Sequence, residues 1–107
     1  MNKNQILREL EKYNFDKNDY IVISGAALVL LGVKDKTNDI DIAVSDKLYE
    51  ELLKQYDCIF EKNVDKYDIW FINGIINFSN HYYNCIDYID YEGYKVQALE
   101  SVLKLKN

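Results

Sequence analysis

The chain has 107 residues, enough for one hydrophobic core but too few for two separate domains. Hydrophobic residues make up 49% and charged residues 29%, a composition typical of a soluble globular protein. The net charge of −5 argues against non-specific nucleic-acid binding, because such binding needs a basic surface that displaces counterions from phosphates. The longest apolar run, residues 21–33, is too short to span a bilayer, so we expect no membrane association.

Hydrophobic periodicity predicts helices alternating with strands in the first half of the chain. Helices are indicated by apolar residues that recur every three or four positions, and strands by short β-branched runs. Gly32 is expected to end the second helix, and the hydroxyl of Ser45 to cap the third. The expected elements are a helix over 2–13, a strand over 20–23, a helix over 25–31, a strand over 39–44 and a helix over 46–56.

Strands dominate the second half. Asn73-Gly74 between two apolar runs is a strong signal for a hairpin with a type I′ turn. Residues 79–93 show no clear period, and we expect a loop with a short helix there. The expected elements are strands over 58–62, 67–72, 75–78 and 94–97, followed by a helix over 99–106. These elements predict a two-layer α+β fold: a mixed central sheet with flanking helices, parallel near its core and antiparallel through the hairpin.

Two acidic residues, Asp39 and Asp41, lie on an otherwise apolar predicted strand. Side chains at positions i and i+2 of a strand point to the same face, so these two carboxylates lie side by side. Mg²⁺ binds one or two carboxylates together with phosphate oxygens and water, so the pair could hold this ion against a polyphosphate. The alternative is that both residues are simply the polar face of an edge strand.

A turn of small residues, Ser24-Gly25, opens the helix that precedes this strand. A glycine lets a ligand approach the backbone closely, and the amides of a helix N-terminus favour a phosphate. Lys36 and Thr37, in the loop before the acid pair, could add a positive charge and hydrogen bonds. A plain structural turn is the alternative, but the acid pair that follows after one short helix and one loop favours a phosphate site.

The run from Ser24 to Ile42, SGAALVLLGVKDKTNDIDI, resembles the signature of the DNA polymerase beta-like nucleotidyltransferase superfamily. It is most similar to the abortive-infection toxin-type and uncharacterised bacterial members, which carry a Gly-Gly-Ala-Ala turn, a glycine, a threonine and Asp-Ile-Asp. Residues 91–106 also look like the later strand and helix of that family. The resemblance implies a single nucleotidyltransferase-like domain over 1–107, lacking most of the C-terminal helical region of the family.

The resemblance implies a metal-dependent enzyme that transfers a nucleoside monophosphate from an NTP to a hydroxyl of a small molecule, an RNA end or a protein. Ser24 and Gly25 match the phosphate-binding turn of the family, although Ser24 replaces its usual first glycine. Asp39 and Asp41 match its ligands for Mg²⁺ or Mn²⁺. A third carboxylate is expected on a neighbouring strand, and Asp68 is the best candidate because it is the only acid in the predicted hairpin strands.

The missing helical region usually helps to build the acceptor pocket of such enzymes. A protein partner or a homodimer could therefore complete the acceptor site. The alternative function is a non-catalytic or partner-dependent nucleotide-binding module of a toxin–antitoxin or phage-defence system, and a third reading is an α+β domain without a site. Cys58 and Cys85 lack any metal-type spacing and no secretory signal is present, so we expect buried thiols in a reducing cytoplasm rather than a disulfide.

Overall fold

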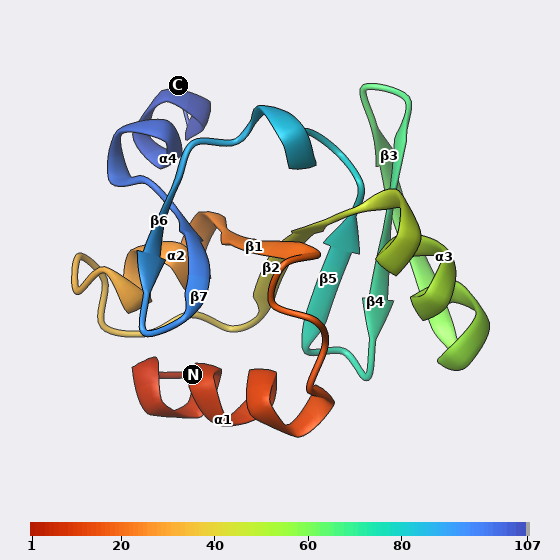
Figure 1. Ribbon diagram of the computed structural model, residues 1–107, viewed down its shortest axis with the longest axis horizontal. Helices are drawn as coiled ribbons and strands as arrows, with labels where there is room; N and C mark the ends of the chain where they lie inside the picture. Colours follow the sequence, from red (N-terminus) through yellow and green to blue (C-terminus); the bar gives the residue numbers. More distant parts are fainter. Residues whose placement is uncertain (107) are drawn as a thin grey trace.

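The computed structural model describes residues 1–106, which form seven strands, four α-helices and one short 3₁₀ helix (Figure 1). The strands are β1 (Tyr20–Ile23), β2 (Ile40–Val44), β3 (Cys58–Val64), β4 (Tyr67–Ile72), β5 (Ile76–Ser79), β6 (Tyr88–Tyr91) and β7 (Tyr94–Gln97). The helices are α1 (Lys3–Tyr13), α2 (Ser24–Leu30), α3 (Asp46–Gln55), α4 (Leu99–Lys106) and the 3₁₀ helix η1 (Tyr83–Cys85).

The seven strands make one mixed sheet in the order β3-β4-β5-β2-β1-β7-β6. Two antiparallel hairpins, β3–β4 and β6–β7, form its ends. The contacts β2–β5 and β1–β7 are parallel, whereas the central strands β1 and β2 run antiparallel. The expected mixed α+β fold is therefore confirmed, with the parallel contacts on either side of the central pair.

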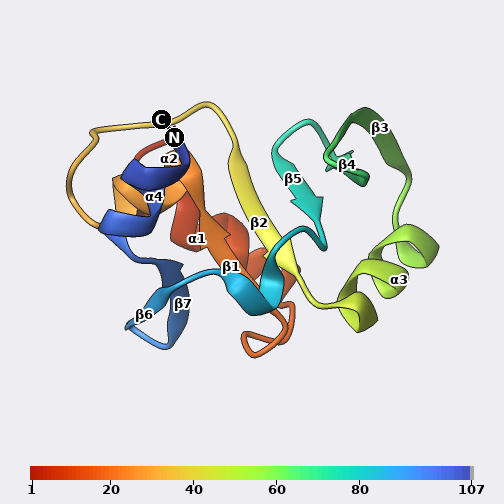
Figure 2. The same cartoon turned by 90° about the horizontal axis from the view of Figure 1, so that it is seen from above.

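The helices pack on one face of the sheet. All four contribute side chains to a single large core cluster, together with alternate strand residues such as Val22, Ile42 and Phe78. Figures 1 and 2 show α1, α2 and α4 near β1 and β7, and α3 near the β3–β5 end of the sheet. The other face carries only a small cluster built around Ile21 and Ala43. The sheet is thus covered on one side and largely open on the other.

The helices end at capping residues that can be recognised in the sequence. In α1, Asn2 and Gln5 form a reciprocal capping box, with N–H to oxygen distances of 2.8 and 3.0 Å. The predicted cap of α3 is confirmed, since the hydroxyl of Ser45 accepts from the N–H of Leu48 at 3.2 Å. Gly32 follows α2 with φ +79°, the left-handed conformation that commonly ends a helix at glycine.

The predicted Asn73-Gly74 hairpin turn is confirmed, because both residues have positive φ, 53° and 68°. A second turn of this kind, at Glu92-Gly93, joins β6 to β7 with φ values of 51° and 90°. The expectation of a loop over 79–93 is wrong for its last part, which contains β6. The Glu-Gly pair flanked by tyrosines was the signal for this hairpin.

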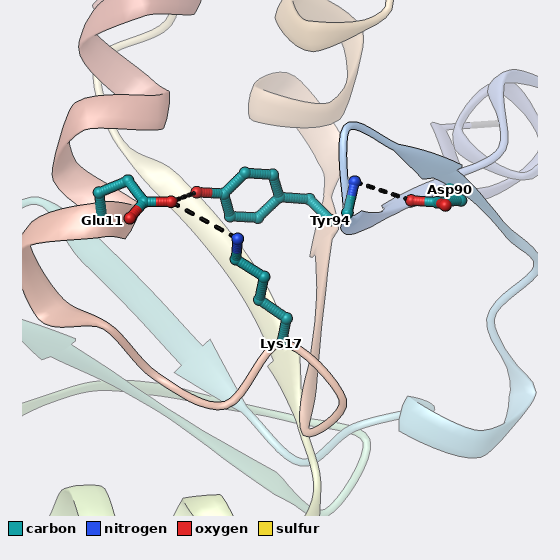
Figure 3. A network of polar contacts seen from close by, with 5 residues as sticks. Glu11, Lys17, Asp90 and Tyr94 are labelled. Atoms are coloured by element: carbon teal, nitrogen blue, oxygen red, sulfur yellow. Dashed lines mark hydrogen bonds and ion pairs between the residues drawn. The ribbon is translucent and has the colours of Figure 1, made fainter.

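Helix α1 is tied to the sheet through β7 (Figure 3). The hydroxyl of Tyr94 donates to the carboxylate of Glu11, which also pairs with Lys17 at 3.5 Å. The ammonium of Lys17 lies 4.2 Å from the ring centroid of Tyr94, a cation–π contact. Burial and the Glu11 carboxylate raise the pKa of Tyr94 to about 12. One tyrosine therefore connects a helix, a loop and a strand.

The two cysteines are both free thiols. Cys58 is half-buried and Cys85 is exposed, so the expectation that both thiols are buried is wrong. Cys85 lies on η1, a short helix within residues 79–93, where a loop with a short helix was expected. Within the described part of the chain, no helix has the length and apolar character needed to cross a membrane.

Candidate functional site

The acid pair lies near the middle of the sheet. Asp39 directly precedes β2 and Asp41 is the second residue of that strand, and both side chains are half-buried. Asp41 pairs with Ile23 of β1 on one side and with Asn77 of β5 on the other. Residues paired in this way point to the same face. No α-helix covers this face, so the carboxylate of Asp41 is open to a ligand from solvent.

The surroundings of Asp41 disfavour its charge. Burial, followed by the nearby carboxylates of Asp39 and Glu61, raises the pKa of Asp41 from its ordinary 3.8 to about 6. The ammonium of Lys62 and a hydrogen bond from Asn77 act in the opposite direction but are the smaller effects. An incompletely solvated anion of this kind favours a cation as its partner.

A cavity of about 170 Å³ connects Asp41 to the turn that opens α2. Asp41 and Ser24 both line it, although they come from different strand ends. Glu61 and Lys62 of β3 and Asn77 of β5 supply its other charged and amide groups. The remaining lining residues are Ile23, Ile42, Ile69, Phe78 and Ser79. The cavity therefore places polar groups of both signs over an apolar base.

The turn contacts the loop that precedes β2. A Cβ atom added to Gly25 would lie 3.0 Å from Oγ1 of Thr37 and 3.7 Å from Nζ of Lys34. The absence of a side chain at Gly25 thus leaves room for a hydroxyl and an ammonium beside the turn. Lys36 is exposed in the same loop.

The backbone at Ser24 differs from that of a simple phosphate-binding turn. It has a left-handed φ of 56°, a conformation more common for glycine, and it lines the cavity. Its backbone N–H donates to Oε1 of Gln97 at 3.0 Å, and Gln97 is almost fully buried. The Ser24 amide is therefore already satisfied within the fold, so the hydroxyl and Gly25 remain as groups for a ligand.

Asp68 lies apart from the acid pair. In the register of the sheet, Phe71 of β4 pairs with Asn77 and shares the face of Asp41, so Asp68, three residues earlier, points to the opposite face. Its carboxylate accepts from the side-chain amide of Asn63 at 2.9 Å. The metal-binding role expected for Asp68 has no support from its position.

Three charged or amide residues of the cavity, Asn77, Glu61 and Lys62, were not predicted as site residues. Asn77 is a lone polar side chain within the apolar run Ile75–Phe78, a visible signal. Glu61 and Lys62 lie on a strand whose pairing partner and bulge could not be predicted locally.

The oxygen atoms at this site suit a hard divalent cation. Asp39 and Asp41 provide carboxylates, the oxygen ligands that such a cation prefers. Among the residues that the structure describes, no three acidic, histidine or cysteine side chains converge closely enough to form a complete metal cage. Mg²⁺ does not require one, because it usually keeps waters and takes phosphate oxygens from its substrate. The residues therefore fit a metal that completes its coordination with water and phosphate oxygens.

The chain matches a known protein family. The model of a family described as "nucleotidyltransferase of unknown function (DUF6036)" matches residues 2–104, nearly the whole chain. No curated protein and no solved structure matches the sequence.

Proposed function

The chain belongs to this family of nucleotidyltransferases of unknown function, and on that basis we propose that it transfers a nucleoside monophosphate from an NTP to a hydroxyl acceptor. In this reaction the acceptor oxygen bonds to the α-phosphorus and loses its proton, while the bond to the β-phosphate oxygen breaks and pyrophosphate leaves. The observation that carries the proposal is the cavity shared by Asp41 and Ser24 on the sheet face that no α-helix covers.

The acid pair and the turn have separate tasks in this proposal. Asp39 and Asp41 hold Mg²⁺ or Mn²⁺, which when bound would activate the acceptor hydroxyl and stabilise the leaving pyrophosphate. The hydroxyl of Ser24 and the open backbone at Gly25 bind the phosphates. Thr37, which lies against Gly25, adds a hydroxyl donor, and Lys36 in the same exposed loop adds positive charge.

The test is transfer of label from α-³²P-NTPs to candidate acceptors in the presence of Mg²⁺ or Mn²⁺. Asp39→Asn and Asp41→Asn are expected to abolish transfer. Asp35→Asn is the matched control, because it removes the same charge from an exposed position in the preceding loop and should leave transfer intact. Transfer that survives both changes in the acid pair would refute the proposal.

A second candidate is a partner-dependent module that binds a nucleotide without turnover alone. The observation in its favour is apolar exposure on both edge strands of the sheet, at Ile59 and Phe60 of β3 and at Tyr88 and Ile89 of β6. Unpaired edges with apolar side chains can pair with another chain. A protein partner or second copy at either edge could then complete the acceptor site. This candidate predicts nucleotide binding to the isolated chain and transfer only after a partner is added.

A further inference from the structure

Gln97 is a polar side chain buried at the end of strand β7, with an exposed fraction of only 1%. Strand β7 lies parallel to β1, with Val96 paired to Val22, so Gln97 lies beside the point at which β1 passes into α2. Its Oε1 accepts from the backbone N–H of Ser24 at 3.0 Å. Its Nε2 donates to the hydroxyl oxygen of Ser101, in the first turn of α4, at 3.1 Å. Gln97 therefore connects the start of α2 to the start of α4.

The groups around Gln97 fix the orientation of its side-chain amide. The backbone N–H of Ser24 can only donate, so it requires the amide oxygen of Gln97 rather than the nitrogen. The hydroxyl of Ser101 accepts from the nitrogen and holds the amide from the other side. Both hydrogen bonds are partly buried, so the loss of either one would leave a poorly solvated polar group.

The backbone of Ser24 needs such a contact because its conformation is strained. Its φ of 56° lies in the left-handed region, where the Cβ of an L-residue comes close to the following carbonyl oxygen. A residue persists in this region only where the surrounding structure holds it there. The next residue, Gly25, lies so close to Thr37 that a shift of the turn would bring the two into collision. The shape of the turn thus depends on a contact from outside it.

We propose that Gln97 and Ser101 are positioning residues that hold the Ser24-Gly25 turn in the shape that binds the phosphates of the nucleotide. The inference rests on the proposed function, which assigns the phosphates to the hydroxyl of Ser24 and the open backbone at Gly25. Gln97 does not itself line the cavity that contains Ser24, so it acts through the turn and not on the ligand. The last helix of the described chain, α4, thereby contributes to nucleotide affinity through Ser101.

The first experiment needs no nucleotide. NMR on the ¹⁵N-labelled protein measures hydrogen exchange at the backbone amide of Ser24, relative to the amide of Val22 in β1. Gln97→Met keeps a side chain of similar length but removes the acceptor, so this relative exchange rate should rise about 10-fold, the effect of losing one buried hydrogen bond. Tyr94→Phe is the matched control, because it removes a hydrogen bond from the same strand and should leave the relative rate unchanged.

The second experiment measures nucleotide affinity by calorimetry, with Mg²⁺ and the α,β-methylene analogues of the common NTPs, which cannot transfer their nucleotide. Gln97→Met is expected to weaken binding about 10-fold, and Ser101→Ala by a smaller factor. Ser101→Thr should restore the affinity, because it keeps the hydroxyl oxygen that accepts from Gln97. Tyr94→Phe should bind as the unaltered chain does. The affinity for Mn²⁺ without nucleotide should stay constant in Gln97→Met, since the acid pair is untouched.

A purely structural role of Gln97 predicts a different pattern. It would lower the free energy of unfolding without changing nucleotide affinity, or it would weaken Mn²⁺ and nucleotide binding together. Either result overturns the inference, as does unchanged exchange at the Ser24 amide in Gln97→Met, while the proposed function stands. If the unaltered chain binds none of the analogues, the proposed function fails and the inference fails with it.

Discussion

Replacing Asp41 with asparagine should make the metal-free protein more stable. The carboxylate of Asp41 lies partly buried near those of Asp39 and Glu61, and nothing on the protein fully compensates its charge. Asparagine has nearly the same shape and carries no charge. It should therefore remove the electrostatic penalty, while the position keeps a side chain able to contact Asn77. Destabilising groups of this kind are characteristic of functional sites.

The magnitude follows from the pKa of Asp41. This pKa rises from 3.8 in the unfolded chain to about 6 in the folded protein. Each pH unit of difference corresponds to about 1.4 kcal/mol, so ionised Asp41 disfavours folding by about 3 kcal/mol at neutral pH. Because the folded pKa is raised, the stabilising effect of the proton is present below pH 3.8 and is lost as the pH rises through 6. The advantage of Asp41→Asn should therefore be largest near neutral pH and small in acid.

Urea unfolding in EDTA, followed by circular dichroism, provides the assay. The gain for Asp41→Asn should be about 3 kcal/mol near pH 7.5 and about 1 kcal/mol near pH 4.5. The control Asp35→Asn, at an exposed loop position, should change stability by less than about 0.5 kcal/mol at either pH. A loss of stability in Asp41→Asn at neutral pH, or a gain that does not vary with pH, would refute the assignment of a strained carboxylate.

Three further changes test the contacts around the site. Gly25→Ala should weaken NTP binding, because the new Cβ would displace the Thr37 hydroxyl, and Thr37→Ala should weaken NTP binding as well. The double variant should bind NTP no more weakly than Thr37→Ala alone. Additive losses of affinity, measured by calorimetry, would contradict the contact between Gly25 and Thr37. Gln97→Leu should destabilise the fold by about 1–3 kcal/mol in thermal unfolding, since the N–H of Ser24 loses its buried acceptor; an unchanged Tm would count against this. Tyr94→Phe should lower the free energy of unfolding by about 1–2 kcal/mol, because it removes the hydrogen bond to the Glu11 carboxylate. Its Mn²⁺ affinity should not change, and a loss of affinity would show that α1 is coupled to the site.

Local features of the sequence predicted much of the fold. The cap of α3 depends on Ser45 and residues close to it, and the hairpin turn depends on the pair Asn73-Gly74. Such signals act over a few residues and can be read without tertiary knowledge. The strand that carries Asp41 was predictable for the same reason, although it begins at Ile40 rather than at Asp39. The hairpin at Glu92-Gly93 carried an equally local signal and was missed because tyrosine and aspartate obscured the period.

The rest of the candidate site depends on pairing between distant segments. Asn77 faces Asp41 only because β5 adds in parallel to β2, and Glu61 reaches the cavity across two further strands. A shift of one residue in the register of β4 would move the Asp68 side chain from one face of the sheet to the other, and the local sequence does not specify that register. An acid of the right type on a plausible strand is therefore insufficient to identify a third ligand.

The bulge in β3 makes the length of this strand a determinant of site charge. Deleting one residue of β3 after Lys62 would restore strict alternation. Glu61 would then pair with Ile69, and Lys62 would turn toward the helix-covered face. The site would then lose the ammonium of Lys62 although no residue of the cavity had been substituted. Insertions and deletions in this hairpin can thus reset the balance of charge at the acid pair as effectively as substitutions within it.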